Sequence, residues 1–299
     1  AGFIASHIVD AYVADGHEVV VIDNMSTGKE ENKNPKAKYY TMDICDPKIT
    51  DIFESEKPEI LSHHAAQIDV RTSVADPQFD IKVNLGGFVN LLEAGRKNGL
   101  KKVILASSGG TVYGEQNVFP ATEDHPTRPI CPYGLNKLGS EQYLYFYEKE
   151  YGLKWVALRY ANIYGPRQNP HGEAGVVAIF IKKMLAGEQP VINGDGKQTR
   201  DYVFVSDVVE ANRLALKDNA YGPYNVGTGV ETDVNAIFRA LREFTDSTCD
   251  EQHVPAKSGE QARCSIEAVR MKNEFNWNTT VEFADGMKRM AEWFVSGNR

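Results

Sequence analysis

The stretch Ala1-Gly2-Phe3-Ile4-Ala5-Ser6-His7 opens the chain, and Asp23 follows at the end of the apolar run Val19-Val20-Val21-Ile22. A glycine before a helix, with an acidic residue about 20 positions later at a strand end, is the pattern of a dinucleotide site. Glycine lets the backbone approach a pyrophosphate, and the start of the helix offers free N–H groups. Asp23 can accept hydrogen bonds from a ribose 2′-hydroxyl and would repel a 2′-phosphate, so the pattern favours NAD over NADP.

Part of this pattern is missing from the sequence. A strand and a first glycine normally precede the turn, and Ala5 stands where a small residue packs the helix against the sheet. We therefore expect that the given chain lacks the first strand of its sheet. Taken alone, the opening stretch is equally consistent with a surface helix that has a glycine cap.

Apolar runs that favour strands alternate with helical stretches through the first half of the chain, at 19–22, 59–63, 102–106 and 155–160. This alternation predicts βαβ units and a parallel sheet, with ligands at the carboxyl ends of the strands. We expect an α/β fold, with a Rossmann-type doubly wound domain at 1–162 and a smaller α+β substrate domain at 163–299. The Gly- and Pro-rich stretch 162–175 predicts a loop at the junction. The segment of about 203–218 is expected to pack back on the first domain.

The composition excludes several classes of protein. The 299 residues include 33 Lys+Arg and 41 Asp+Glu, for a formal charge of −8, and 42% are hydrophobic, as in soluble globular proteins. An acidic balance argues against nucleic acid as a partner. No apolar run approaches the roughly 18 residues of a membrane span. The four cysteines lie far apart, which gives no metal framework and fits a reducing cytosol, so we expect a cytoplasmic protein.

The segment Pro132-Tyr133-Gly134-Leu135-Asn136-Lys137 contains Tyr-x-x-x-Lys. Pro132 fits a helix start, and positions i and i+4 share one helix face, so Tyr133 and Lys137 point the same way. A phenol with a pKa near 10 is ionised to about one part in a thousand at pH 7, so ionising it fully at this pH costs about 4 kcal/mol. One positive charge about 4 Å away contributes about 4 kcal/mol at an effective dielectric constant of about 20. Lys137, helped by an oxidised nicotinamide, can thus turn Tyr133 into a base.

Further motifs accompany this pair in order along the chain, at 1–7, 23–28, 43–44, 63–67, 84–87, 107–114, 132–137, 159–167, 200–203 and 225–229. With them the sequence resembles the extended short-chain dehydrogenase/reductase superfamily. Within it, the chain is similar to the NAD-dependent epimerase/dehydratase family, and most of all to the UDP-glucose (galactose) 4-epimerases. The resemblance covers nearly the whole chain.

The resemblance implies that NAD is the cofactor and that particular residues hold it. The implied contacts are Gly2, Phe3 and Ile4 at the pyrophosphate, Asp23, Asn24, Ser26, Thr27 and Gly28 at the adenosine ribose, Asp43 and Ile44 at the adenine, and Ala65, Ala66, Gln67, Asn84, Tyr133 and Lys137 along the rest of the cleft. The implied reaction is 4-epimerisation of a UDP-hexose through a transient 4-keto sugar. Tyr133 would be the acid/base, and Lys137 would tune it and hold the nicotinamide ribose.

One position of the catalytic site departs from the family pattern. The family has Ser or Thr where this chain has Gly109, and that hydroxyl binds the sugar 4-oxygen. Ser108, Thr111 or an ordered water must replace it, and Thr111 is slightly favoured.

The resemblance also implies a set of UDP-sugar contacts: Asn162, Val177, Arg200, Lys257, Glu260, Arg263 and Cys264. The family's Arg-x-Gly-Asp appears here as Lys257-Ser258-Gly259-Glu260, and Lys cannot grip a diphosphate bidentately. Arg200 and Arg263 are then expected to carry more of that contact. Cys264 is small where the family has a bulky residue that excludes N-acetyl groups. We therefore expect UDP-GlcNAc and UDP-GalNAc to be accepted as well, unless Cys264 only packs in the interior.

Three alternatives compete with this function. A 4,6-dehydratase is disfavoured, because Gly110 and Thr111 replace its Asp-Glu pair. An epimerase of a UDP-uronate stays open. A non-catalytic NAD-binding regulator also stays open, although Tyr133 and Lys137 argue against it. A homodimer is expected, and the tyrosine ladder Tyr143-Tyr147-Tyr151 could cover its dimer surface. A monomer with this helix face against its own sheet stays open.

Overall fold

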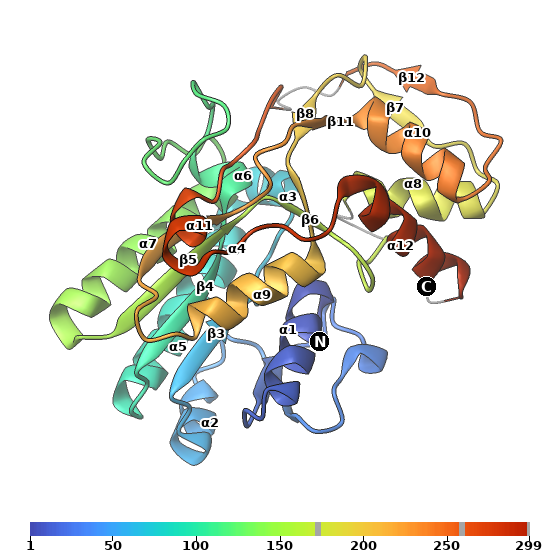
Figure 1. The fold of residues 1–299 in the computed structure, drawn as a ribbon. Coiled ribbons are helices and arrows are strands. Elements are labelled where there is room, and N and C mark those ends of the chain that lie inside the picture. Colours follow the sequence, from blue (N-terminus) through green and yellow to red (C-terminus); the bar gives the residue numbers. More distant parts are fainter. Residues whose placement is uncertain (171–174, 257–260, 298–299) are drawn as a thin grey trace. The chain divides into compact units, whose positions relative to one another are not determined.

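The computed structural model describes residues 1–170, 175–256 and 261–297 (Figure 1). The chain forms two compact units, each built from segments that are distant in sequence. The first comprises Ala1–Glu115, Pro126–Tyr160 and Val209–Tyr224, and the second comprises Gln116–His125, Ala161–Val208 and Asn225–Arg299.

Parallel strands form the centre of the first unit. Strands β3 (Ile60–His63), β4 (Lys102–Ser108) and β5 (Lys154–Tyr160) pair in parallel, in a four-stranded sheet of order β10-β5-β4-β3 that is completed by β10 (Gly222–Val226). Strands β1 (Val20–Asp23) and β2 (Lys38–Thr41) form a second parallel pair. Parallel neighbours joined by helical crossovers confirm the predicted α/β class.

Helices follow nearly every strand of this unit. They are α1 (Phe3–Ala14), the 3₁₀ turn η1 (Glu30–Asn32), α2 (Ile49–Glu56), α3 (Val70–Ala75), α4 (Pro77–Asp80), the π-helical segment η2 (Ile81–Gly86), α5 (Gly87–Lys97), α6 (Gly109–Val112) and α7 (Pro132–Tyr151). Figure 1 shows α5 and α7 alongside β4 and β5, where Phe88, Leu105, Leu144 and Trp155 form a buried cluster. Burying each such side chain contributes about 1.5–3 kcal/mol, so this cluster fixes α7 against the sheet.

The ends of α7 are set by local sequence. Cys131 is extended and Pro132 occupies the first helical position, where its missing N–H costs nothing. Gly152 ends the helix with φ +71°, a left-handed conformation that glycine adopts without strain. The helix therefore begins one residue before Tyr133, which places Tyr133 and Lys137 in its first turns.

The second unit pairs short strands. Strand β6 (Asn162–Tyr164) lies parallel to β9 (Tyr202–Phe204), β7 (Val191–Asn193) lies parallel to β12 (Gln252–Val254), and β8 (Thr199–Arg200) lies antiparallel to β11 (Thr232–Asp233). The helices here are α8 (Val176–Leu185), α10 (Val234–Phe244), α11 (Val269–Phe275) and α12 (Phe283–Val295), while α9 (Val205–Ala215) crosses from the second unit into the first. Helices α8, α10 and α12 pack on one another, with Phe180 against Phe238.

Two sequence expectations need correction. The stretch 162–175 is not a continuous loop, because its first residues form β6, whose ladder with β9 satisfies the backbone. The tyrosine ladder of α7 is not one exposed surface. Tyr147 is buried and donates a hydrogen bond to Glu93, whereas Tyr143 and Tyr151 are exposed. Among the described residues, no helix combines the length and the apolar character that crossing a bilayer requires.

Candidate active site

Tyr133 and Lys137 lie together where α7 begins. Lys137 is 4% exposed and donates a hydrogen bond of 2.8 Å to the carbonyl oxygen of Ala106 on β4. Its Nζ lies 5.6 Å from the centroid of the Tyr133 ring. The backbone N–H of Tyr133 donates to Ser73 Oγ at 3.2 Å, which ties the start of α7 to α3. The structure thus brings the two predicted catalytic residues onto one face of α7.

Burial dominates the titration of both groups. It lowers the pKa of Lys137 to about 8, and the negative charge of Asp80 opposes that change. Burial also raises the pKa of Tyr133 above its usual value, and Asp80 adds to the rise. The sequence argument considered only the favourable charge of Lys137 and omitted the cost of burying the phenol. Of the described residues, Lys137 Nζ contacts the Ala106 carbonyl and the Tyr133 ring, and it makes no hydrogen bond with the phenol oxygen.

A buried network that sequence reasoning missed lies beside this pair. Asp80 is fully buried, and its carboxylate accepts hydrogen bonds from the side-chain amides of Gln67, Asn84 and Asn136. Asp80 and Asn84 are four residues apart on a helical segment, and Asn136 lies inside the Tyr-x-x-x-Lys motif. The i,i+4 spacing of two polar residues between apolar positions was the available sign of a shared buried site.

Thr111 is the residue whose hydroxyl was predicted to replace the one absent at Gly109. Its Oγ1 is buried and has no hydrogen-bond partner among the described residues. A buried hydroxyl without a partner costs about 1–3 kcal/mol, so a hydrogen bond from this atom to a ligand or a water would be favourable. Ser108 is half-buried at the last position of β4, opposite Tyr160 in the register with β5.

Residues predicted to surround an adenosine lie at the carboxyl ends of β1 and β2. Asp23 Oδ1 accepts from the N–H of Met25, and Asn24 Nδ2 donates to Asp43 Oδ2 at 3.0 Å. A Cβ on Gly28 would lie only 3.1–3.2 Å from the Asp23 carboxylate oxygens, so glycine leaves this space open. The N–H of Cys45 donates to Asp43, which lowers the pKa of that carboxyl group.

The remaining predicted cofactor residues occupy three positions. Ser26 and Thr27 are exposed in the loop after β1, and Ile44 is buried after β2. Ala65, Ala66 and Gln67 are half-buried after β3, and the backbone of Gln67 exchanges two hydrogen bonds with the Asn84 amide. Gly2 is the extended residue before α1, and Phe3 and Ile4 form the first turn of that helix.

These features fit an NAD molecule. Within the described part of the chain, no side chain caps the N-terminus of α1, and its first turn holds no acidic residue. Its N–H groups and positive dipole end therefore stay available to a pyrophosphate. Asp23 is 24% exposed in its side chain and so is accessible to a ribose. The cofactor residues cluster at the carboxyl ends of parallel strands, the usual ligand position in open α/β sheets.

The second unit holds the described residues that were predicted to bind the UDP-sugar. Thr199 pairs through its backbone with Ala262 and Cys264, so Arg200, Arg263 and Cys264 lie on neighbouring segments. The N–H of Asn162 donates to the carbonyl of Asp201, which places it beside the same strand. Val177 is buried in α8. Lys257 and Glu260 lie outside the described residues.

Arg263 and Cys264 have partners that the sequence did not indicate. Arg263 donates two hydrogen bonds to Glu231, and its guanidinium lies 4.0 Å from the centroid of the Phe119 ring. Cys264 is buried, and the amide of Gln116 donates to its sulfur at 3.6 Å. Glu231 therefore holds the Arg263 guanidinium in place. A diphosphate that binds Arg263 would compete with the Glu231 carboxylate.

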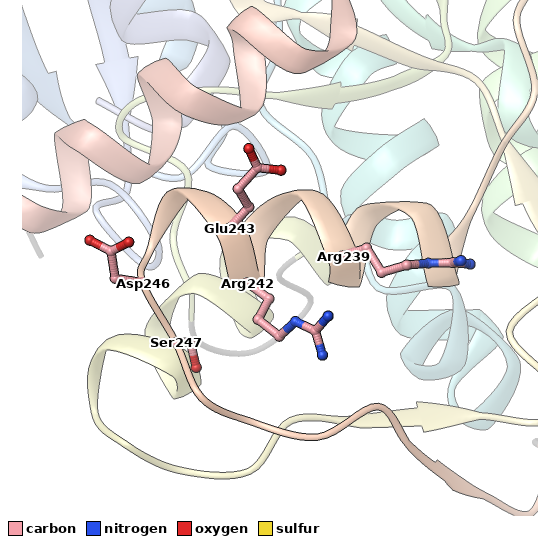
Figure 2. A pocket seen from close by; sticks show the side chains of 5 residues that line it. All are labelled: Arg239, Arg242, Glu243, Asp246 and Ser247. Carbon is pink, nitrogen blue, oxygen red and sulfur yellow. The ribbon is translucent and has the colours of Figure 1, made fainter.

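A shallow hollow lies elsewhere in the second unit. Figure 2 shows Arg239, Arg242 and Glu243 on α10, with Asp246 and Ser247 just after it. None of the site residues predicted from the sequence lines this hollow, so it is not part of the candidate active site.

The fold and the site define an NAD-dependent enzyme class. The model of the NAD dependent epimerase/dehydratase family matches residues 1–227, and the chain belongs to this family. The chain is 42% identical over 300 residues to the UDP-glucose 4-epimerase of Mycolicibacterium smegmatis, covering 98% of this chain and 96% of that protein.

Solved structures agree with this assignment. A UDP-glucose 4-epimerase of Thermotoga maritima with UDP-glucose is 44% identical, with a TM-score of 0.96 over 100% of this chain and 97% of that one. A UDP-glucose 4-epimerase of Thermus thermophilus in complex with NAD is 42% identical, with a TM-score of 0.94 over 99% of this chain and 96% of that one.

The close approach of α6 to α7 gives a prediction about stability. A Cβ on Gly134 would lie 2.9 Å from the carbonyl oxygen of Thr111, whereas a Cβ on Gly139 would lie 3.6 Å from a Leu85 methyl group. We expect Gly134→Ala to lower the free energy of unfolding by about 1–3 kcal/mol. Gly139→Ala on the same helix should leave it unchanged or raise it by up to about 1 kcal/mol. Denaturant unfolding measures both, and equal effects of the two substitutions would contradict the packing described here.

Proposed function

We propose that this chain is an NAD-dependent 4-epimerase that interconverts UDP-glucose and UDP-galactose. The observation that carries the proposal is the pair Tyr133 and Lys137 on one face of α7, in a member of the epimerase/dehydratase family. Thr111, in the neighbouring helix α6, has a buried hydroxyl that finds no hydrogen-bond partner among the described residues. Relatives that are 42–44% identical over nearly their whole length are UDP-glucose 4-epimerases, which supports the same substrate class.

Residues of the first unit would hold the cofactor. The first turn of α1 would bind the pyrophosphate, and the segment from Asp23 to Gly28 would bind the adenosine ribose. Asp43 and Ile44 would contact the adenine, and the segment after β3 would line the rest of the cleft. Lys137 would hold the nicotinamide ribose. NAD, when bound, supplies the hydride acceptor for C4 of the sugar and returns the hydride.

Tyr133 would remove and return the proton of the sugar 4-hydroxyl. Its Oη would accept this proton as the C4 hydrogen leaves and would give it back when the 4-keto sugar is reduced on its other face. Because burial raises the pKa of Tyr133, the phenolate needs positive charge nearby, and the Lys137 ammonium on the same helix face supplies it. Thr111 Oγ1 would donate a hydrogen bond to the 4-oxygen in place of the hydroxyl absent at Gly109.

Residues of the second unit would bind the UDP part. Arg200 and Arg263 would contact the diphosphate, with Asn162, Val177, Lys257 and Glu260 as further contacts. A small residue at Cys264 is proposed to leave room for an N-acetyl group, so UDP-GlcNAc and UDP-GalNAc would also be substrates.

The substrate assignment predicts turnover without added reductant. Purified protein with NAD should convert UDP-galactose to UDP-glucose, and UDP-GalNAc to UDP-GlcNAc, as followed by chromatography of the sugar nucleotides. Failure with the acetylated pair alone would reject the proposal for Cys264. Turnover of UDP-glucuronate in place of both pairs would reject the hexose assignment.

Tyr133→Phe in the same assay tests the acid/base. Removal of a general acid/base lowers kcat by about 10²–10⁴-fold, and NAD binding should persist. Tyr143→Phe is the matched control, because Tyr143 lies on the same helix and is exposed. Full activity of Tyr133→Phe would refute the mechanism.

The hydroxyl that replaces the one missing at Gly109 is identified by two variants. Thr111→Val keeps the shape of the side chain and removes Oγ1, and it should lower kcat by about 10-fold or more with a smaller effect on KM. Ser108→Ala should retain most of the activity. The reverse order of effects would assign the role to Ser108.

We also propose a homodimer through the exposed face of α7. Leu135 and Phe146 are 56% and 48% exposed and lie about three turns apart on that helix, which places both on one face. An exposed apolar face of this kind marks an interaction surface. Sedimentation velocity should show a dimer for the protein and a monomer for Phe146→Glu, and a monomeric parent protein would reject the proposal.

A further inference from the structure

We propose that Asp80 is the counter-ion of Lys137, a positioning residue whose buried charge keeps Lys137 an ammonium beside Tyr133. The expected effect of Asp80 on kcat rests on the proposed function. The expected effect of Asp80 on the ionisation of Lys137 does not. Neither the family match nor the relatives assign a role to this residue.

The surroundings of Asp80 solvate its charge without neutralising it. Asp80 Oδ1 accepts from Gln67 Nε2 at 2.7 Å and from Asn84 Nδ2 at 2.9 Å, and Oδ2 accepts from Asn136 Nδ2 at 2.6 Å. All three donors are neutral amides, and in the described ranges no cationic nitrogen lies within 4.0 Å of this carboxylate. A buried carboxylate without a direct ion pair is costly unless another charge compensates it.

Lys137 is a buried positive charge, and a nearby negative charge would offset the cost of its burial. It is 4% exposed, and its hydrogen bond goes to the neutral carbonyl of Ala106. Asn136, which holds Asp80, is its neighbour in sequence, and α4 and η2 both pack against α7. Opposite charges interact over longer distances in a poorly polarisable interior than in water, so each group offsets the burial cost of the other without direct contact.

The direction of the titration agrees with this geometry. Burial lowers the pKa of Lys137 to about 8, and Asp80 is the group that raises it again. Without Asp80, burial would act unopposed, and a larger share of Lys137 would be neutral at physiological pH.

The other ionisable groups around α7 do not provide this charge. His63 ends β3 and His64 follows it, and burial lowers the pKa of both, so they are neutral near pH 7. Glu141 on α7 is committed to a buried ion pair with Arg159 of β5, at 2.6 Å.

Several groups on α3, α5, η2 and the start of α7 also do not provide this charge. Glu93 of α5 is paired with Arg96 and accepts from Tyr147, at the far end of α7. Arg71 of α3 and Lys82 of η2 are exposed cations. Burial raises the pKa of Cys131 and that of Tyr133, which leaves both neutral.

Hydrogen bonding alone does not require a carboxylate at position 80. An asparagine there can keep its oxygen toward Gln67 and Asn84 and turn its NH₂ toward Asn136. The amide of Asn136 can then flip so that its oxygen accepts, since the two ends of an amide have nearly the same shape. Asp80→Asn thus removes the charge with little change in shape or in the number of hydrogen bonds.

Titration of Lys137 tests the proposal directly. In protein labelled with [ε-¹³C]lysine, NMR follows each lysine with pH, and Lys137→Met identifies the resonance of Lys137. We expect Asp80→Asn to lower the pKa of Lys137 by at least about one unit from its value near 8. An unchanged pKa would overturn the proposal, and this readout needs neither NAD nor a sugar substrate.

The pH profile of kcat provides the functional readout. Loss of the negative charge favours neutral Lys137 and ionised Tyr133, so both limbs of the profile should move to lower pH in Asp80→Asn. A merely structural role would lower the profile without moving it. If the parent protein lacks 4-epimerase activity but Lys137 still shifts, the proposed function fails and the counter-ion assignment stands.

Two further variants serve as control and rescue. Asp207→Asn removes another buried carboxylate, which accepts hydrogen bonds from Thr280 in the second unit, and it should leave the pKa of Lys137 unchanged. The double variant Asp80→Asn/Asn136→Asp returns a carboxylate to the same hydrogen bond from the α7 side, and it should restore the Lys137 pKa. If Asp80→Asn does not fold, a folded double variant with a low Lys137 pKa would overturn the proposal.

Discussion

The buried ammonium of Lys137 is the constraint around which the first unit is organised. A lysine that is 4% exposed needs a helix that holds it, an acceptor that receives its N–H groups and a negative charge that offsets its burial. Helix α7 holds the lysine, the carbonyl of Ala106 on β4 accepts its hydrogen bond, and Asp80 provides the negative charge. The same helix places Tyr133 one turn before Lys137, with Lys137 Nζ 5.6 Å from the centroid of the Tyr133 ring.

A buried ion pair joins the elements around that arrangement. Arg159 of β5 binds Glu141 of α7 through two hydrogen bonds, and Ser107 at the end of β4 donates to the same carboxylate. Arg159 also donates to the phenol oxygen of Tyr113. Two strands, α7 and the turn after β4 are thereby joined close to Ser108 and Thr111. Removing one partner would leave an uncompensated buried charge, which costs about 3–5 kcal/mol.

Sequence reasoning succeeded where the pattern is local and failed where tertiary packing decides. The strands at 19–22 and 102–106 and the shared face of Tyr133 and Lys137 follow from periodicity and spacing alone. The burial of Tyr147 and the ion pair of Arg263 with Glu231 depend on segments that are distant in sequence. Asp80 was missed because only its contact with Asn84 is local, while Gln67 and Asn136 reach the same carboxylate only in the folded chain.

The most direct test of this account is the ionisation of Tyr133 in the NAD-loaded protein. Ultraviolet difference titration near 295 nm, with Tyr133→Phe as the blank, isolates the signal of this phenolate. The account predicts that Lys137→Met raises the pKa of Tyr133, because the ammonium then no longer offsets the burial of the phenol. An identical pKa with and without Lys137 would show that the lysine does not control the tyrosine and would contradict the central claim.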